Sequence, residues 1–160
     1  MIIMGIDPGS NVTGYGIIRK ESNNLNWIDD GQIAPSKDMA FYDRIFYVFT
    51  QLRKILERYR PEEIAIEDLF FSKNVKSSIR LGHVRGAIIV SALISEVPIF
   101  EYTPLQIKKA VVGYGKATKE QVRNMVKIIL DIKKDMGLDS SDALAVAICH
   151  ANHTGQIMDS

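Results

Sequence analysis

The sequence is poor in cysteine. Cys149 is the only one among 160 residues, so the chain can form neither an internal disulfide bond nor a cysteine-rich zinc site. This composition agrees with a protein that works in a reducing compartment.

Long apolar runs are also lacking. The longest, such as residues 87–94, fall well short of the roughly 20 residues that cross a bilayer, and no charged stretch precedes an apolar one at the N-terminus. We therefore expect a cytoplasmic protein without a membrane partner. An apolar content of 46% over 160 residues is enough for one compact core, and we expect residues 1–160 to form a single domain.

The chain lacks a large net charge, since its net charge is +1, but its charged residues are unevenly distributed along the sequence. Residues 72–134 carry 12 Lys and Arg against 4 Asp and Glu, whereas the remainder carries 8 against 15. This division suggests a basic side that faces phosphate, next to an acidic centre. The same division is also expected of ordinary solvated helix faces.

The order of elements predicts a mixed α/β fold. Residues 2–6 are apolar, and because Pro8 disfavours helical backbone at the preceding residue, Asp7 should end this strand. Residues 15–19 and 25–33 are expected to continue an antiparallel meander. Helices at 39–60 and 78–96 then alternate with strands at 63–67 and 98–102, which is typical of parallel crossovers. Further helices are expected at 104–112, 119–130 and 140–153.

The predicted helix at 78–96 is apolar around most of its circumference, so it must be covered on more than one side. One side can face the sheet. The other side could face a second subunit, with close approach at Gly86, Ala87, Ser91 and Ala92, although deep burial within one chain explains the same pattern.

Four acids from three distant segments are expected to converge. Asp7 and Glu67 each end a strand, and Asp139 and Asp142 are spaced i, i+3 at the start of the last helix. If the two strands are neighbours, both of their carboxylates lie at one sheet edge, where open α/β sheets place their sites. We call Asp7, Glu67, Asp139 and Asp142 the acid quartet.

Each member also has an ordinary structural explanation. Asp139 is a good helix N-cap, and Asp142 would favour the helix dipole. Asp7 could make a turn hydrogen bond, and Glu67 could be a solvated strand end. The functional interpretation therefore depends on their convergence.

A converged acid quartet would need a cation. Two like charges about 4 Å apart repel by about 4 kcal/mol at an effective dielectric constant of 20, and a divalent ion removes this conflict. Ligands that are all carboxylates suit Mg²⁺ or Mn²⁺ rather than zinc. Two such ions can support phosphodiester hydrolysis by activating a water molecule and stabilising the leaving oxygen.

The chain resembles a known family, the RuvC-type Holliday junction resolvases of the ribonuclease H-like superfamily. An ordered set of motifs that spans nearly the whole chain carries this resemblance: Gly5-Ile6-Asp7-Pro8-Gly9-Ser10, Thr13-Gly14-Tyr15-Gly16, Ala65-Ile66-Glu67 with Phe70, Lys73-Asn74, Leu81-Gly82, Arg85-Gly86, Phe100-Glu101-Tyr102, Val111-Val112-Gly113 with Gly115, and Asp139 with Ser141-Asp142-Ala143-Leu144-Ala145.

The resemblance implies a five-stranded ribonuclease H-like sheet, with three antiparallel strands followed by parallel crossovers and with helices flanking it. It implies a homodimer that binds a four-way DNA junction and nicks two strands symmetrically during recombination and repair. The acid quartet matches the family's catalytic acids, which hold Mg²⁺, with two ions per site and Mn²⁺ as a substitute. The branch-migration proteins RuvA and RuvB are the expected partners. Some relatives carry histidine among the last two acid positions, whereas this chain has Asp139 and Asp142.

Other residues match family positions that contact DNA. Phe70 matches an aromatic residue near the exchange point of the junction, where stacking on an unpaired base contributes roughly 1 to 3 kcal/mol; Phe71 competes for this role, and either ring could be core. Lys108 and Lys119 match basic positions that face the scissile phosphate, and ordinary surface lysines are the alternative. Contacts to the DNA backbone are assigned to Lys73, Asn74, Lys76, Arg80 and Lys116. His150 and His153 are interpreted as ordinary helix residues.

Three rival interpretations remain. The opening Asp7-x-Gly9 with Thr13-Gly14 also resembles the phosphate hairpin of sugar kinases and actin-like ATPases, but those proteins need a second lobe, for which 160 residues leave no room. A non-catalytic junction-binding protein would be expected to have lost one or more acids. A ribonuclease H-like nuclease acting on RNA would share both fold and metal chemistry.

Overall fold

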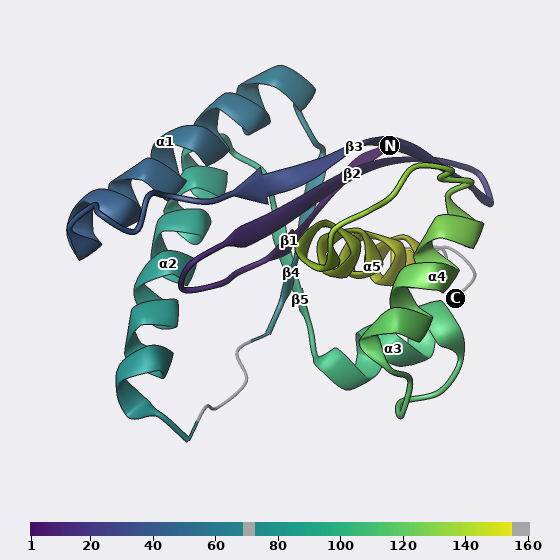
Figure 1. Ribbon diagram of the computed structural model, residues 1–160. Coiled ribbons are helices and arrows are strands. Elements are labelled where there is room, and N and C mark those ends of the chain that lie inside the picture. Colours follow the sequence, from purple (N-terminus) through teal and green to yellow (C-terminus); the bar gives the residue numbers. More distant parts are fainter. Residues whose placement is uncertain (69–72, 155–160) are drawn as a thin grey trace.

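The computed structural model describes residues 1–68 and 73–154, which form one five-stranded sheet with helices on both faces (Figure 1). The strands are β1 (Ile2–Asp7), β2 (Thr13–Glu21), β3 (Asn24–Ile33), β4 (Glu63–Glu67) and β5 (Ile99–Tyr102). Their spatial order is β3-β2-β1-β4-β5; β1, β2 and β3 pair antiparallel, whereas β4 and β5 join in parallel. The predicted mixed sheet is confirmed.

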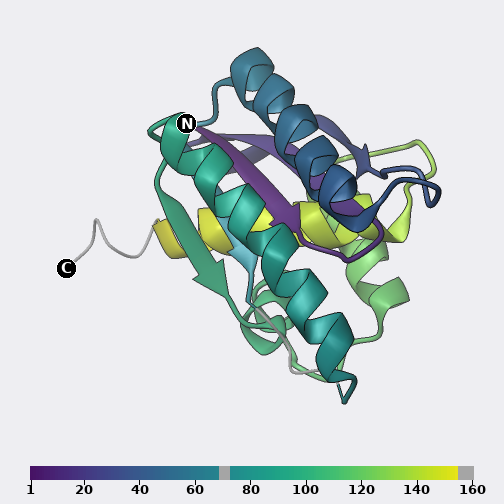
Figure 2. The same cartoon turned by 90° about the vertical axis from the view of Figure 1, so that its left-hand side faces the viewer.

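The helices divide between the two faces. They are α1 (Phe41–Tyr59), α2 (Val75–Ile94), α3 (Pro104–Val112), α4 (Lys119–Ile129) and α5 (Leu138–Thr154). Figure 2 shows α1 and α2 side by side over one face, and α5 crosses behind the sheet on the other. Successive side chains of a strand point to opposite faces, so Ile3 packs with α3, α4 and α5 while Met4 and Ile6 pack with α1 and α2.

Two helices start earlier than the sequence suggested. α2 begins at Val75 because the side chain of Asn74 caps it, accepting a hydrogen bond from the Ser77 amide at 3.3 Å. α5 begins at Leu138, so Asp139 lies inside its first turn and is not its N-cap. The ordinary capping explanation for Asp139 is therefore wrong.

The apolar helix α2 is longer than its longest uninterrupted apolar run suggested. The helix has 20 residues, and an 18-residue window within it has a mean hydropathy of 1.2, so by length and composition alone it could cross a membrane. However, Val84, Ile88 and Ala92 are buried in the core between α1 and the sheet, and a core helix passes the same test. One side of α2 therefore belongs to the core, although only 28% of its apolar window is buried.

The residues on the inner and outer faces of α2 are not all those that the sequence suggested. Ser91 and Ala92 are fully buried in the chain's own core, so the suggestion that they permit close approach of a second subunit is wrong. The outward face carries instead what we call the outer stripe of α2, which consists of Ile79, Gly86, Val90 and Leu93. Ile79, Val90 and Leu93 are 55%, 49% and 62% exposed, and a methyl group added at Gly86 would meet nothing within 4 Å.

His150, which the sequence suggested was an ordinary helix residue, is a buried residue of α5. Its ring is 1% exposed and lies between Tyr102 and Glu63. The Tyr102 hydroxyl lies 2.7 Å from Nδ1, and Glu63 Oε2 lies 2.6 Å from Nε2. Burial lowers the pKa of His150, so the neutral ring donates from Nε2 to Glu63 and accepts at Nδ1 from Tyr102. This arrangement ties α5 to β4 and β5.

The backbone of α5 lies unusually close to β1 and β2, and glycines make this possible. A Cβ atom built on Gly5 would stand 2.0 Å from the Ala143 carbonyl oxygen and 2.8 Å from the Ala147 amide nitrogen. One built on Gly14 would stand 2.1 Å from the Asp139 carbonyl oxygen. Because the obstructing atoms are backbone, any other residue would push the helix away from the sheet.

Replacing Gly5 by alanine should therefore lower the free energy of unfolding by about 1 to 3 kcal/mol, the usual cost of overpacking a core. Urea unfolding measures this change. The matched control is Gly82→Ala, because a methyl group at Gly82 meets nothing within 4 Å and alanine favours helix over glycine. Equal stability of the Gly5→Ala variant and the wild-type protein would contradict the close packing of α5.

Candidate active site

Three elements bring the acid quartet together at one edge of the sheet. Asp7 ends β1 and Glu67 ends β4, and the two strands run parallel with Ile6 opposite Ile66. Asp139 and Asp142 enter from the first turns of α5, which crosses β1 and β2. Segments 60 or more residues apart in the sequence thus meet, as the sequence predicted.

Asp7 is the most strongly perturbed member of the acid quartet. Its pKa is raised to about 8, first by burial, next by a hydrogen bond with the Glu67 side chain, and then by the charges of Glu67, Asp142 and Asp139. A hydrogen bond between two carboxyl groups requires a proton on one of them. In the protein alone, a shared proton therefore relieves part of the repulsion that a cation would otherwise relieve.

The two acids of α5 have separate polar partners. Asp139 accepts a hydrogen bond from Gln32 Nε2 at 3.1 Å. Asp142 Oδ2 lies 3.4 Å from Lys119 Nζ. Burial raises the pKa of Asp142, and Lys119 opposes that rise. The same ion pair raises the pKa of Lys119. Each group therefore favours the charged form of the other, although burial still leaves the pKa of Asp142 above its ordinary value.

A small cavity of about 190 Å³ lies between these groups, and we call it the acid cavity. Its lining consists of Asp7, Glu67, Pro104, Ile107, Lys108, Lys119, Val122, Asp142 and Ala145. This volume is far above the roughly 10 to 15 Å³ that admits one water molecule. The apolar residues of α3, α4 and α5 form walls that limit access of water, while the acids and lysines provide polar groups.

Two helices begin at the acid cavity, and a third, α5, reaches it one turn after its start, at Asp142. Pro104 and Lys119 are the first residues of α3 and α4, and both line it; Asp139 lies in the first turn of α5. Helix N-termini carry partial positive charge that favours nearby anions by typically 0.3 to 1 kcal/mol each. They therefore lower the cost of gathering carboxylates here and also suit an incoming phosphate.

The chemical type of the donor atoms suits a hard divalent cation. All four acids offer oxygen, which Mg²⁺ and Mn²⁺ prefer. In residues 1–68 and 73–154, however, no three His, Cys, Asp or Glu side chains lie close enough together to hold a metal ion. The acids interact as a pair, Asp7 with Glu67, and with Lys119 and Gln32. A metal would therefore have to replace the shared proton and draw Asp142 and Asp139 inward.

The lysines assigned to the scissile phosphate both reach the acid cavity. Lys108 is half-buried on α3, and the Lys119 side chain on α4 is 72% exposed. Both lysines line the same cavity as Asp7 and Glu67. Ordinary surface lysines would not need to converge in this way. Whether they contact DNA stays a prediction.

The residues assigned to the DNA backbone lie elsewhere. Lys73, Lys76 and Arg80 are exposed at the start of α2, and Lys116 is exposed between α3 and α4. Asn74 is exposed as well, and its side chain caps α2. The Arg80 guanidinium lies 5.0 Å from the centre of the Phe41 ring. Phe70 and Phe71 lie outside the described residues.

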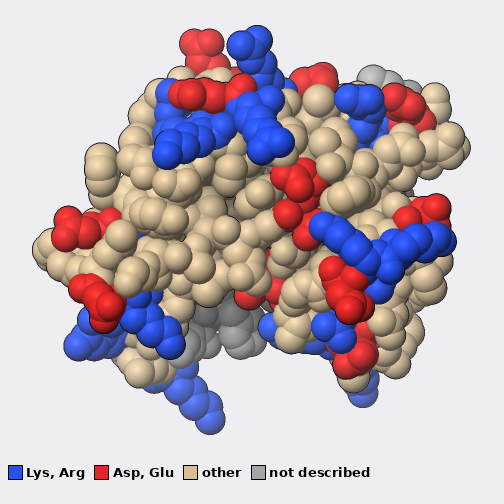
Figure 3. Space-filling view, turned by 45° about the horizontal axis from the view of Figure 1, so that its top comes forward, with Lys and Arg blue, Asp and Glu red and all other residues tan. Residues whose placement is uncertain are grey.

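Basic side chains do not form one continuous stripe on the face in Figure 3, where clusters of Lys and Arg alternate with Asp and Glu. On this face, the Lys and Arg side chains are therefore divided among separate patches. Contacts between DNA and this face would have to be made at several points.

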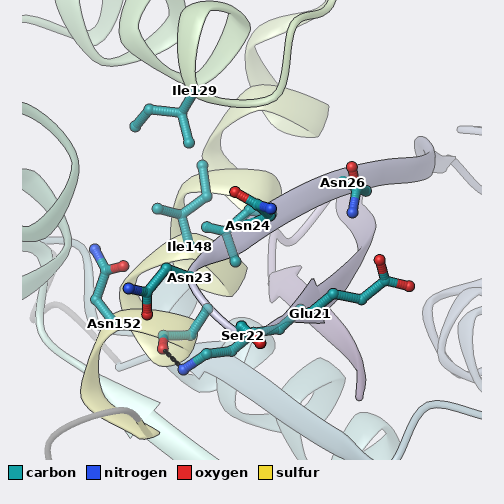
Figure 4. Close-up of a pocket in the computed structure, with 11 residues that line it drawn as sticks. Glu21, Ser22, Asn23, Asn24, Asn26, Ile129, Ile148 and Asn152 are labelled. Carbon is teal, nitrogen blue, oxygen red and sulfur yellow. Dashed lines mark hydrogen bonds between the residues drawn. The ribbon is translucent and has the colours of Figure 1, made fainter.

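A larger hollow, of about 820 Å³, lies at another part of the molecule, around the β2–β3 turn and the end of α5 (Figure 4). Asn23, Asn24 and Asn152 surround Ile148 there. Its lysine, Lys20, already donates to the Ala151 carbonyl at 2.5 Å and to Thr154 Oγ1 at 3.0 Å. The acid cavity is smaller, but it holds the convergent charged groups, and we assign the chemistry to it.

Gln32 is a site residue that sequence reasoning missed. It lies on β3 opposite Gly14, which in turn lies opposite Asp7, so the three residues form one row across the sheet. The alternation of β3 gave no signal for this, because a glutamine on an edge strand is usually solvated. Only the strand register, with its irregularity between Ile17 and Ile18, places Gln32 beside Asp139.

Comparison with known proteins gives a consistent result. The family model "Crossover junction endodeoxyribonuclease RuvC" matches residues 3–150. A crossover junction endodeoxyribonuclease RuvC from Geotalea uraniireducens is 51% identical over 152 residues, covering 95% of this chain and 89% of the relative. The T. thermophilus RuvC, solved in complex with a Holliday junction substrate, superposes with a TM-score of 0.91 at 32% identity, covering 98% and 96%. The yeast mitochondrial Holliday junction resolvase shares the fold, with a TM-score of 0.68 at 12% identity over 98% of this chain and 82% of that chain.

The acid quartet should destabilise the protein when no metal is present. The carboxylate of Asp7 is ionised in the unfolded chain at pH 7, but its pKa of about 8 in the folded protein means that it must take up a proton or be repelled there. Asp7→Asn avoids this cost and supplies an amide that can donate to Glu67, so we expect this variant to melt at a higher temperature than wild type in EDTA at pH 7. The gain in free energy of unfolding should be about 1 kcal/mol or more, since one unit of pKa shift corresponds to about 1.4 kcal/mol. Differential scanning fluorimetry measures it.

Addition of Mg²⁺ should then raise the melting temperature of the wild-type protein and leave that of Asp7→Asn nearly unchanged. Asp38→Asn is the control, because Asp38 is exposed and lies in the loop before α1. Equal Mg²⁺ responses of wild type and Asp7→Asn would exclude Asp7 as a ligand.

Proposed function

Because the chain belongs to the RuvC family of crossover junction endodeoxyribonucleases, which hydrolyse DNA strands at Holliday junctions, we propose that its acid quartet performs this cutting by holding Mg²⁺. The observation that carries the proposal is the meeting of Asp7, Glu67 and Asp142 in one cavity with Lys108 and Lys119. Two ions per site are proposed, with Mn²⁺ able to substitute. When bound, the metal would supply an activated water and a Lewis acid for the leaving oxygen.

The protein's own residues have separable roles in this proposal. Asp7 and Glu67 hold the metal at the end of the sheet, and Asp139 and Asp142 complete the ligand set from α5. Lys108 and Lys119 attract the phosphate and balance the negative charge that grows on its oxygens. Ile107, Val122 and Ala145 limit the water that reaches the phosphate.

Contacts outside the acid cavity would select the branched substrate. We propose that Lys73, Asn74, Lys76, Arg80 and Lys116 hold DNA backbone, and that Phe70, with Phe71 as the alternative, stacks at the exchange point. Backbone contacts position DNA without reading its sequence, so preference for a junction would come from its shape. The protein is proposed to work in the cytoplasm, with the DNA, together with RuvA and RuvB.

The test is cleavage of a synthetic mobile four-way junction by the purified protein with Mg²⁺, Mn²⁺ or EDTA, beside a linear duplex and an RNA–DNA hybrid. Paired symmetric nicks in the junction alone, with metal alone, are expected. Asp7→Asn should abolish cutting, by 10³-fold or more, while its dissociation constant for the junction stays within about threefold of wild type. Phe70→Ala should slow junction cutting without changing the melting temperature.

Three other results would contradict this proposal. Tight junction binding by wild type without any cutting would indicate a non-catalytic junction-binding protein. Cutting of the hybrid in preference to the junction would indicate a nuclease acting on RNA. Loss of binding by Asp7→Asn would mean that Asp7 holds the fold or the DNA and not the metal.

We further propose that the protein is a homodimer, which symmetric nicking requires. The outer stripe of α2 supports this proposal, because Ile79, Val90 and Leu93 are exposed apolar residues at helical spacing and Gly86 leaves room for a second helix. An interface on a two-fold axis presents the same patch from both copies, and one helical stripe packed on its own copy satisfies that condition.

Leu93→Glu should convert the dimer to a monomer, because it places two like charges across the axis. Light scattering after size exclusion is expected to give twice the chain mass of 18.0 kDa for wild type and the single mass for the variant. Ile128→Glu is the matched control, since Ile128 is 72% exposed on α4. A dimer that survives Leu93→Glu would place the interface elsewhere.

A further inference from the structure

Arg85 is a buried arginine that does not line the acid cavity. It lies on the inner face of α2 with 6% of its surface exposed. Among the buried residues of the described chain it is the one with a permanent charge, since the others are Thr13, Ser91, Ser140, Ser141, His150 and apolar residues. Burying a charge is costly unless it is paired and hydrogen-bonded, so the contacts of Arg85 should show what its place requires.

The guanidinium of Arg85 joins the ends of two parallel strands. Nη1 donates to the backbone carbonyl oxygen of Glu67, the last residue of β4. Nη2 donates to Glu101 Oε1 on β5 at 2.8 Å. Ile66 lies opposite Glu101 in the β4–β5 ladder, so the arginine spans two neighbouring strands at the point where the ladder ends.

The bridged residue is itself a member of the acid quartet. The Glu67 carbonyl is fixed by Arg85, while its side chain lines the acid cavity and hydrogen-bonds to Asp7. A rotation or shift of the backbone at Glu67 would move its carboxylate by a comparable amount. Misplacement of a catalytic group by about 1 Å can lower a rate by 10²-fold.

Arg85 does not line the acid cavity, so it acts on the site through Glu67. Its counter-ion is well suited to holding it, because the Glu101 side chain is 48% exposed while that of Arg85 is 7% exposed. Solvated Glu101 is inexpensive to keep charged, and it anchors the guanidinium in the orientation that reaches the Glu67 carbonyl. The planar fork of arginine can make both bonds at once, whereas the single ammonium of lysine cannot reproduce that geometry.

We propose that Arg85 is a positioning residue for the cutting reaction: oriented by Glu101, it fixes the backbone of Glu67 so that the Glu67 carboxylate meets Asp7 at the separation that the metal requires. The inference rests on the proposed role of the acid quartet and adds to it a residue on α2. The outer stripe lies on the same helix, so the helix that would contact the second subunit also holds one of the acids in place.

The experiment compares Arg85→Lys, Arg85→Met and Glu101→Gln with Arg53→Lys. Arg53 is the matched control because it is a partly buried arginine that also ties a helix, donating from α1 to Ser95 Oγ at 2.8 Å, and it has no contact with the acid quartet. Three quantities are measured: the single-turnover cleavage rate at saturating junction, the dissociation constant for the junction in EDTA, and the rise in melting temperature of DNA-free protein on adding Mg²⁺.

For Arg85→Lys and Arg85→Met we expect cleavage to slow by 10- to 100-fold with the junction dissociation constant within about twofold of wild type. The rise in melting temperature with Mg²⁺ should be less than half that of wild type, and higher Mg²⁺ should restore part of the lost rate of Arg85→Lys. Glu101→Gln should show the same changes to a smaller extent. Arg53→Lys should change only the melting temperature in EDTA.

The proposal is overturned if the Arg85 variants cut at the wild-type rate, or if their Mg²⁺ response equals that of Arg53→Lys; Arg85 would then only stabilise the fold. An Arg85→Met protein that does not fold leaves the decision to Arg85→Lys and Glu101→Gln. The Mg²⁺ response is read without DNA, so it decides the positioning role even if the wild-type protein failed to cut junctions. That failure would count against the proposed function alone.

Discussion

The close contact between the backbone of α5 and strands β1 and β2 is the constraint on which the rest of the structure depends. Gly5 and Gly14 let the helix backbone come within atomic contact of the sheet, and the start of α5 thereby carries Asp139 and Asp142 to the edge where β1 and β4 end. With side chains between them, helix and sheet would pack at the usual spacing, and the acids from the two layers would be several ångströms further apart.

This packing gathers several carboxylates in a buried place, where keeping each of them charged costs free energy. Asp7 and Asp142 both have raised pKa values for which burial is the leading cause, so the site lowers the stability of the metal-free protein. The surroundings partly offset this cost. Lys119 pairs with Asp142, Gln32 donates to Asp139, and the first residues of α3 and α4 line the same cavity as the carboxylates, where helix N-termini favour negative charge. A fold of 160 residues with two apolar clusters, one on each side of the sheet, can carry such a local cost.

Much of the site could be predicted because it follows from strand order. Asp7 before Pro8 had to end a strand, and Glu67 ended another, so a parallel pairing of these strands was enough to bring them together. The partner of Asp139 could not be predicted, since Gln32 reaches it only through the register of β2 and β3. The faces of α2 could not be assigned either, because a helix that is apolar all round gives no periodic signal. Ser91 and Ala92 were therefore placed on the wrong side.

Arg85 illustrates a related limit. In the sequence it is one basic residue among many in the middle of the chain, and charge alone would place it on the surface facing DNA. Its burial depends on two acceptors, the Glu67 carbonyl and Glu101, and one of them is a backbone atom that leaves no mark in the amino-acid pattern. Buried cations of this kind are recognisable only after the strands have been placed.

Helix ends ordinarily fray, and this protein builds the wall of its acid cavity from helix ends. α3 and α4 each begin with the same reciprocal pair of hydrogen bonds, Thr103 with Gln106 and Thr118 with Gln121. Such a pair satisfies two amide groups that would otherwise open to water. The first turns that carry Pro104 and Lys119 are therefore closed more firmly than a helix terminus usually is, and their amides should exchange hydrogen slowly for their position. Rigidity in this wall comes from the local sequence of each helix start and is in place before any DNA arrives.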